Sequence, residues 1–191
     1  MGTGCAAVEP EKRMYPLALG AGVSEEGFVL KYAMPDMNVT TGQEKPEEDP
    51  VSVLTLAGRN FQEIEKVYNR SQEKFLDLGH LQVVILDESM LTEENRKAFL
   101  EYLKQEEHVG EDVYMFRTGM LGEVFHWKGA EERSVGEYLQ GIQENRTTGQ
   151  QKKGVTLREA YHQFYQDGTL PWIPSVWVNG DLLEVDYGSA E

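Results

Sequence analysis

Apolar side chains in the middle of the chain recur first at helical spacing and then without interruption. The helical set consists of Phe61, Ile64, Tyr68, Ser71, Phe75 and Leu78. This spacing predicts one long amphipathic helix, with Asn60 as N-cap, Glu63 as capping-box carboxylate and Gly79 as the left-handed residue that ends it. The apolar run Val83–Leu86 then predicts a strand buried on both faces, at the centre of a sheet covered by helices.

Shorter patterns on either side of this stretch predict an α/β fold. Strands are expected over residues 15–21, 28–34, 51–57 and 112–117, and a helix capped by Thr92 is expected over residues 93–105. The first two strands form a hairpin whose turn places Gly27 at positive φ. The order β-β-β-α-β-α-β therefore predicts a mixed sheet flanked by helices, because crossovers join the later strands.

The last third of the chain is expected to be helical and to end in a hairpin. Ser134 caps one predicted helix, and Thr156 with Glu159 forms the capping box of another, which Gly168 ends. Prolines keep residues 171–178 extended. The dipeptide Asn179-Gly180, with apolar runs on both sides, predicts a tight hairpin.

Composition excludes several classes of function. The formal net charge of −15 argues against nucleic-acid binding and against a polybasic contact with anionic lipid. No apolar run has the length of about 20 residues that crosses a bilayer. A single cysteine allows no internal disulfide and no thiol-ligated metal site. The 191 residues fit one domain with a short appendage.

Few side chains form a constellation typical of chemistry. Ser71 and Lys74 have the S-x-x-K spacing of serine acyl enzymes, but a packed serine bonded to a backbone carbonyl explains this position better. The four histidines lack helical metal-ligand spacing, and His80 is expected to hydrogen-bond the end of the central helix. The acidic loop Glu44–Asp49 has no calcium-loop spacing. No cofactor or metal is therefore expected.

Two further features allow two interpretations each. The dipeptide Thr3-Gly4 before Cys5 resembles a lipoprotein cleavage point, although no apolar segment precedes it, and an ordinary exposed cysteine is the other interpretation. The aromatic group of Trp172, Trp177 and Tyr187 is either a partner surface or the core of the terminal hairpin. Residues 1–13 are expected to form a disordered tether.

Several segments together carry a resemblance to a known family. They are Tyr15–Gly20, Met34-Pro35-Asp36, Val53–Gly58, Phe75–Ile85 with its Gly-His-Leu-Gln, Phe99–Leu103 and Val113–Phe116. In this order they resemble the N-terminal domain of the Ger(x)C family of spore-germination lipoproteins, the C subunits of germinant receptors. The resemblance covers residues 14–118 well and residues 134–178 more loosely.

The resemblance implies an exported, non-enzymatic protein in which Cys5 is lipidated. Its expected place is the outer face of the cytoplasmic or inner spore membrane, beside membrane-embedded receptor subunits. Residues 14–187 would form one α/β domain, and residues 188–191 would begin a downstream segment or a tail. We expect a receptor component that acts through protein–protein contacts. The alternatives are a nutrient-binding domain with an aromatic pocket and, third, an acyl enzyme that uses Ser71 and Lys74.

Overall fold

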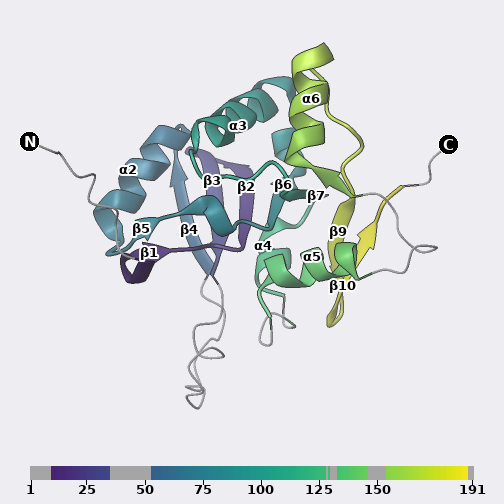
Figure 1. The fold of residues 1–191 in the computed structure, drawn as a ribbon, viewed down its shortest axis with the longest axis horizontal. Coiled ribbons are helices and arrows are strands. Elements are labelled where there is room, and N and C mark those ends of the chain that lie inside the picture. The colour runs from purple at the N-terminus through teal and green to yellow at the C-terminus, as the bar shows by residue number, and fades with distance from the viewer. Residues whose placement is uncertain (1–9, 35–52, 128, 130–132, 146–153, 189–191) are drawn as a thin grey trace, which may run out of the picture.

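A computed structural model describes residues 10–34, 53–127, 129, 133–145 and 154–188, and Figure 1 shows the chain as a ribbon. Its centre is an eight-stranded sheet in the order β10-β9-β7-β6-β2-β3-β4, with β8 paired to one end of β7. The strands β2, β6, β7 and β9 run parallel, whereas β3, β4, β8 and β10 each pair antiparallel to a neighbour. The fold is therefore a mixed α/β sheet, as the sequence predicts.

The strands of this sheet are short and regular. They are β2 (Ala18–Ser24), β3 (Gly27–Ala33), β4 (Val53–Gly58), β6 (Val83–Asp87), β7 (Tyr114–Thr118), β8 (Val155–Thr156), β9 (Ser175–Asn179) and β10 (Leu182–Asp186). A separate ribbon joins β1 (Arg13–Met14) in parallel to β5 (Phe75–Leu76). The helices are α2 (Phe61–Ser71), α3 (Glu93–Gln105), α4 (Leu121–Phe125), α5 (Val135–Glu144) and α6 (Leu157–Asp167).

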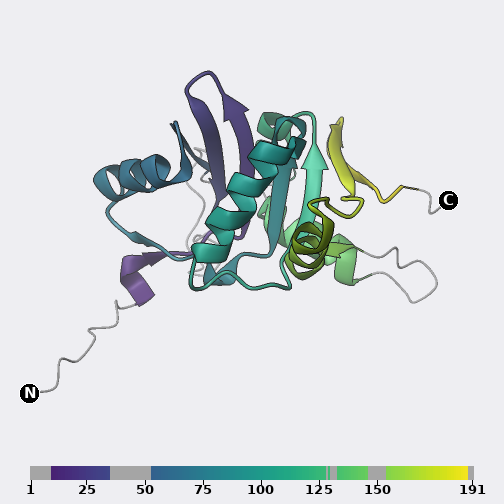
Figure 2. The ribbon, with the colours of Figure 1, turned by 90° about the horizontal axis from the view of Figure 1, so that it is seen from above.

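Helices cover both faces of the sheet, and alternating side chains fill the two cores. On β6, Val84 and Leu86 belong to the core under α2, α3 and α6, whereas Val83 and Ile85 belong to the core under α4 and α5. All four side chains are at most 1% exposed, so the prediction of a central strand buried on both faces is confirmed. Figure 2 shows α3 lying across the sheet, with α2 and α6 on either side of it.

The predicted starts of helices α3, α5 and α6 are confirmed, because the capping residues act locally, whereas the strand expected over residues 15–21 is β2, Ala18–Ser24. Helix α3 has the expected bounds and begins at Thr92, whose hydroxyl accepts a hydrogen bond from the Asn95 N–H. The capping boxes at Ser134 and Thr156 are both formed. Gly27 and Gly168 have φ of 127° and 77°. The β9–β10 hairpin is formed, but Asn179 pairs with Leu182, so the turn lies one residue later than predicted, at Gly180-Asp181.

The prediction of one long central helix is wrong. Helix α2 ends at Ser71, and the backbone is already extended at Gln72. The Ser71 hydroxyl donates to the carbonyl of Val67, and such bonding competes with the helical ladder at this point. The Tyr68 hydroxyl donates to the carbonyl of Lys74 and holds the departing chain under the helix.

The residues expected in the last turns of that helix have other roles. Phe75 lies in strand β5 with 56% of its side chain exposed, and Leu78 begins the 3-10 helix η2 (Leu78–His80). The side chain of Asp77 caps η2 by accepting from the Gly79 N–H. Gly79 therefore lies within this 3-10 turn and has no positive φ.

The sequence around helix α4 has no pattern strong enough to predict a helix there. Its five residues lack a side-chain N-cap bond, so propensity alone would not hold them as a helix. Packing against the sheet stabilises the helix instead. Phe125 and Leu121 lie over Gly20 of β2, and a Cβ atom on Gly20 would come within 2.6 Å of the Phe125 ring. The sheet under α4 thus needs a residue without a side chain at this position.

Among the described residues, no helix has the length and apolarity needed to cross a bilayer.

Candidate functional site

The chain enters the folded domain through a short ordered segment at one end of the sheet. Residues Pro10–Lys12 form the 3-10 helix η1, and Arg13 and Met14 then pair with Phe75 and Leu76 in the β1–β5 ribbon. Residues 10–13, which were expected in the disordered tether, thus have defined structure. Figure 1 shows this ribbon beside the end of α2.

A salt bridge fixes this segment to the domain. The guanidinium of Arg13 donates to the carboxylate of Asp77, and their side chains are 25% and 9% exposed. His108, on the connection after α3, has its Nδ1 atom 4.0 Å from the same carboxylate. Burial opposes ionisation of Asp77, but the Gly79 N–H, the Arg13 guanidinium and His108 outweigh it and hold the pKa below its usual value. Three separate parts of the chain therefore meet at Asp77.

His80 does not serve the end of the central helix, because that helix ends at Ser71. Its ring instead packs against the ring of Tyr15, with centroids 4.5 Å apart. The imidazole thus adds a second contact between the start of the domain and η2. The role remains structural, although the partner differs from the expected one.

Ser71 and Lys74 do not share a helical turn in the structure. Ser71 is the last residue of α2, whereas Lys74 lies beyond the helix and precedes β5. The Ser71 hydroxyl donates to the Val67 carbonyl at 2.8 Å, and the Gln72 side-chain amide donates to it at 3.2 Å. Ser71 is exposed and does not lie on the apolar stripe. The alignment that an S-x-x-K nucleophile requires is therefore not formed.

The β1–β5 surface, defined as residues 10–14 and 70–76, combines an exposed aromatic ring with basic residues. Phe75 is among the most exposed large apolar side chains of the described residues. Lys74 precedes it, Arg13 faces it across the ribbon, and Arg70 lies in the last turn of α2. With Lys12, this surface has four basic residues and two acidic ones, and the salt bridge to Asp77, the next residue, compensates the charge of Arg13.

The aromatic group near the C-terminus divides between surface and interior. Trp172 is 58% exposed and stacks against the guanidinium of Arg117, which lies 4.2 Å from the ring centroid. Tyr187 is buried, and Trp177 is partly buried on β9. The structure therefore buries Tyr187 at the end of the hairpin, whereas a partner surface at the exposed Trp172 stays a prediction.

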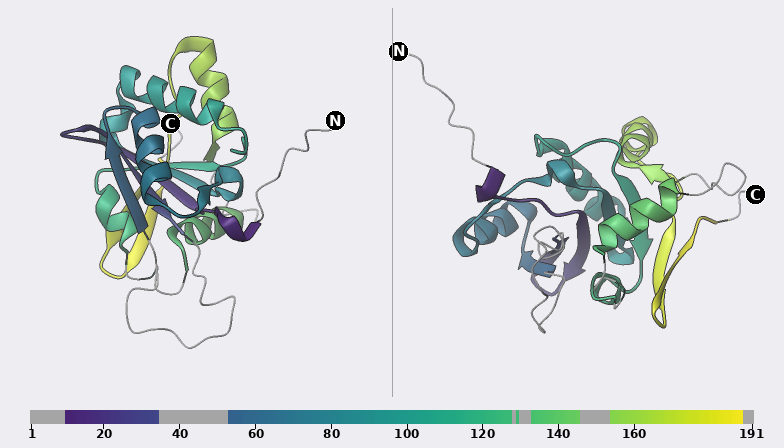
Figure 3. Two further views of the ribbon diagram at one scale, coloured as in Figure 1. Left: turned by 90° about the vertical axis from the view of Figure 1, so that its left-hand side faces the viewer. Right: turned by 60° about the horizontal axis from the view of Figure 1, so that its bottom comes forward.

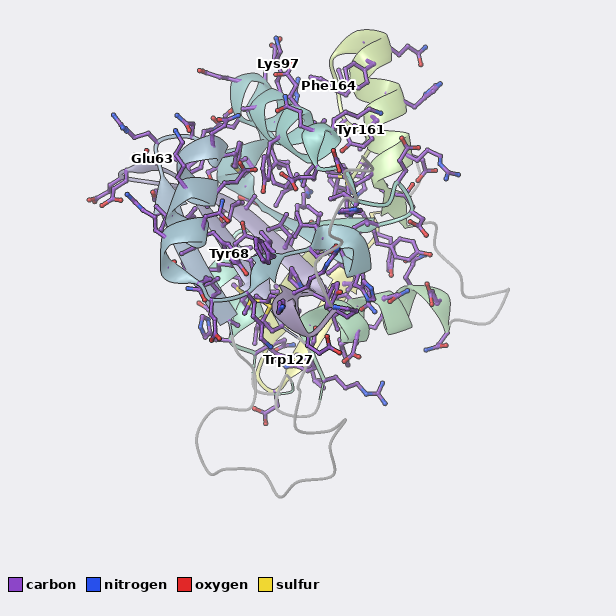
Figure 4. All side chains as sticks on the ribbon, turned by 60° about the vertical axis from the view of Figure 1, so that its left-hand side comes forward. Glu63, Tyr68, Lys97, Trp127, Tyr161 and Phe164 are labelled. Carbon is purple, nitrogen blue, oxygen red and sulfur yellow. The ribbon has the colours of Figure 1, made fainter. Side chains whose placement is uncertain are left out.

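Two carboxyl groups meet between α2 and the end of α3. Burial and a hydrogen bond shared with Glu65 raise the pKa of the Glu106 carboxyl to about 7, and the charge of Glu107 adds to the shift. The buried side chains of Tyr32 and Tyr102 meet beside this pair. Figure 4 shows Tyr68 in the same interior layer, while Glu63 and Lys97 point outward. No sequence spacing signals this pair, because its members come from different helices.

Two hollows on the described surface are lined by a mixture of charged, polar and apolar groups. One of about 490 Å³ beside the start of α2 is lined by Glu26, Ala57, Gly58, Arg59, Glu63 and Val67. Another of about 460 Å³ beside α6 is lined by Gly154, Val155, Glu159, His162, Gln163, Gln166, Asp167 and Pro171. Neither has the ring of aromatic side chains that would favour a nutrient pocket.

The carboxyl ends of the parallel strands are the usual ligand position of an α/β sheet. Here the Asp87 carboxylate accepts hydrogen bonds from the Ser89 N–H and hydroxyl, at 2.9 and 2.6 Å. Thr118 Oγ1 accepts from the Met120 N–H at 3.1 Å. These polar groups cap the turns that follow β6 and β7. Within the described ranges, no three His, Cys, Asp or Glu side chains are grouped to hold a metal ion.

Two expected features, Cys5 and the acidic loop Glu44–Asp49, lie outside the described residues. The described residues form an α/β domain whose salt-bridged N-terminal segment borders a basic and aromatic surface.

Comparison with known proteins gives the family. Residues 6–177 match the family described as "Spore germination protein N-terminal domain". The chain is also similar to spore germination protein GerQC of Bacillus cereus, at 23% identity over 141 residues, or 73% of this chain and 39% of that protein. No solved structure matches. The chain belongs to the Ger(x)C family of spore-germination proteins.

Proposed function

We propose that this chain is the N-terminal domain of a lipid-anchored germinant-receptor component that works outside the cytoplasm, without catalysis. The observation that carries the proposal is the family match over residues 6–177. The chain spans 39% of the length of GerQC, so a receptor role of the whole protein extends beyond the part matched. The role in germination follows from the family, and the receptor partners and anchor belong to the proposal.

The structure supports an anchored interaction domain in two ways. The start of the domain is fixed rather than loose, because β1 pairs with β5 and Arg13 binds Asp77. A pull at the N-terminus would therefore act on the domain as a whole. Contact with membrane-embedded receptor subunits would use exposed anchors such as Trp172, since large aromatic residues dominate binding surfaces.

The first test is mass spectrometry of the membrane fraction of spores that carry the native gene. A peptide that begins at Cys5 with a diacylglyceryl group is expected, together with its loss in a Cys5→Ser strain. Unmodified Cys5 in a soluble fraction would contradict the anchor. Because the measurement reads the modification itself, it does not depend on a germination phenotype.

The second test is germination of spores that carry the Cys5→Ser gene. A reduced response to nutrients, with an unchanged response to a trigger that bypasses nutrient receptors, is expected.

A third test replaces Trp172 with a photoreactive residue, which should crosslink to a membrane-embedded receptor subunit. The same replacement at exposed Tyr165 serves as comparison. Equal or absent capture at both positions would remove Trp172 from the proposed contact.

A further inference from the structure

We infer that the open edge of strand β4 (Val53–Gly58) binds an extended segment of a basic partner protein, which adds to the sheet as a further strand. The inference goes beyond the proposed function and rests on the sheet alone, so its failure would not contradict the anchor or the role of the family. It is carried by an unprotected edge strand that lies next to a hollow and an acidic turn.

Strand β4 lies at one end of the sheet. It pairs with β3 on one side, and no strand of the described residues pairs with its other side. Every second residue of β4 directs its backbone N–H and C=O groups toward this outer side, and an extended polypeptide is the molecule whose own backbone can pair with such a row. The left panel of Figure 3 looks onto this side of the molecule, where β4 and α2 lie together.

The two edges of the sheet differ in how they are protected. Strand β10, at the other edge, carries Glu184 and Asp186, and such charges discourage pairing with another strand. Strand β4 has the sequence Val-Leu-Thr-Leu-Ala-Gly, with neither a charged residue nor a proline. Thr55 at its middle is exposed. An edge of this kind is expected to pair with a further strand.

A hollow of about 490 Å³ lies where β4 meets α2. Ala57 and Gly58 line it from the strand and Val67 from the helix, so a side chain of an added strand would find apolar contact there. Helix α2 packs Phe61 and Ile64 into the core on the face of the sheet, and the hollow lies beside this contact. The edge therefore offers both unpaired backbone groups and room for a side chain of the partner.

The charges around the hollow have an acidic excess. Arg59 and Glu63 both line it and neutralise each other, with 3.0 Å between Nε and the carboxylate. Glu26 also lines it, and Glu25 is its neighbour in the β2–β3 turn. Both are exposed, and no ion pair among the described residues neutralises them. A basic residue of the partner is therefore expected at this end of β4.

Two other charges bear on the identity of the partner. Lys31 points to the opposite face of the sheet, because its neighbours Leu30 and Tyr32 belong to the core under α2, and its ammonium group donates to the Thr55 hydroxyl at 3.0 Å. It therefore leaves the acidic excess at the hollow unchanged. The net charge of −15 repels a second copy of this chain and attracts a basic protein, which favours a basic partner over pairing of two β4 strands.

The test uses the purified 191-residue chain and synthetic peptides of alternating threonine and valine. One peptide has lysine at both ends, a second has glutamate there, and a third has lysine ends and two adjacent central prolines, one of which must face β4. Residue-resolved amide exchange is measured by NMR with and without each peptide. We expect the lysine peptide to slow exchange at alternate residues of 53–58, the glutamate peptide to bind about fivefold more weakly, and the proline peptide to have no effect.

Glu26→Lys and Asp181→Lys form a matched pair of variants, because both acids are exposed in hairpin turns at opposite edges of the sheet. Glu26→Lys should weaken binding of the lysine peptide about fivefold, whereas Asp181→Lys should leave it unchanged. Unchanged thermal unfolding of both variants would show that the fold is intact. The comparison of the three peptides on the wild-type chain depends on neither variant.

Uniformly slow exchange of residues 53–58 in the free chain would show that the edge is already covered, and would overturn the inference. Equal slowing at β10, equal effects of the lysine and proline peptides, or equal effects of the two substitutions would overturn it as well. Slowing at β4 that grows with protein concentration in the absence of peptide would assign the edge to a second copy of this chain instead of a basic partner.

Discussion

The guanidinium of Arg13 binds the carboxylate of Asp77, 64 positions further along the chain, and so joins strand β1 to the middle of the fold. The pair lies beside the β1–β5 ribbon, where Met14 accepts a hydrogen bond through its carbonyl from the Asp77 N–H. Backbone and side chain thus hold the same two segments together. The proposed N-terminal anchor would transmit its position to the domain through this joint.

Arg13→Gln should destabilise the protein by about 1–3 kcal/mol, because Asp77 would remain buried without its charged partner. The loss of stability should shrink in acid. Because the pKa of Asp77 is lowered in the folded protein, the pair stabilises the fold fully above the ordinary aspartate pKa. This stabilisation is lost as the pH falls through the pKa of Asp77 in the folded protein. Urea unfolding at pH 7 and pH 3 measures both effects.

Arg59→Gln is the control for the Arg13 experiment. Arg59 also pairs with a carboxylate, that of Glu63 at 3.0 Å, but the arginine side chain is 81% exposed. Solvent screens such a pair, so little change in stability is expected. An equal loss in the two variants would contradict the view that burial gives the Arg13 pair its strength.

Gly136 and Gly141 lie on the same helix and should respond in opposite directions to alanine. A Cβ atom on Gly136 would come within 2.5 Å of the Leu17 carbonyl, which is backbone and cannot move aside cheaply. Gly136→Ala should therefore cost about 1–3 kcal/mol. At Gly141 the nearest atom is the Asn145 side-chain nitrogen at 3.5 Å, so alanine should stabilise by about 0.5–1 kcal/mol. Thermal unfolding of both variants checks the pair.

The sequence predicts the central strand and the helix starts well because the signals that define them are local. The run Val83–Leu86 and the caps at Thr92, Ser134 and Thr156 each act within a few residues, and all four appear as expected. The predicted length of helix α2 is wrong for a long-range reason. Residues 75–78 keep helical spacing, but Phe75 and Leu76 pair instead with β1, more than 60 residues earlier.

The candidate surface could be predicted only in part. Trp172 stands out as a large aromatic residue, but its contact with Arg117 depends on how β7 and β9 pair. Phe75 was expected in the apolar stripe of a helix, and its exposure follows only from the β1–β5 ribbon. The Glu65–Glu106 pair needs two helices placed by the fold. Each of these features arises from packing between segments distant in sequence.

Ser71→Ala tests the third functional hypothesis. The Ser71 hydroxyl is bonded to the Val67 carbonyl, and Lys74 lies outside the helix, so no activated nucleophile is expected. A fluorescent penicillin and a fluorophosphonate should both leave the wild-type protein unlabelled, as they should the Ser71→Ala variant. Labelling of the wild type that disappears in this variant would restore the acyl-enzyme hypothesis.

The Glu65–Glu106 pair should make stability depend on pH near neutrality. The folded-state pKa of Glu106 is raised to about 7 from the ordinary 4.5, so the folded protein binds this proton more tightly than the unfolded chain does. The stabilisation of the fold by this bound proton is therefore complete below pH 4.5 and is lost as the pH rises through 7. Glu106→Gln keeps an uncharged group beside Glu65 and should be more stable than wild type at pH 8 by about 1 kcal/mol, since solvent screens the half-exposed carboxyl.

Urea unfolding of wild type and Glu106→Gln between pH 5 and pH 8 measures this difference. The wild type should lose stability relative to the variant as the pH rises, because two ionised carboxylates then repel each other between α2 and α3. Glu101→Gln is the control, since Glu101 is exposed on the same helix and pairs weakly with Lys97 at 4.0 Å. Parallel curves for wild type and Glu106→Gln would show that Glu106 is already ionised at pH 5 in the folded protein. A curve for Glu101→Gln that matches that of Glu106→Gln would assign the effect to the net charge of α3 instead of the shared proton.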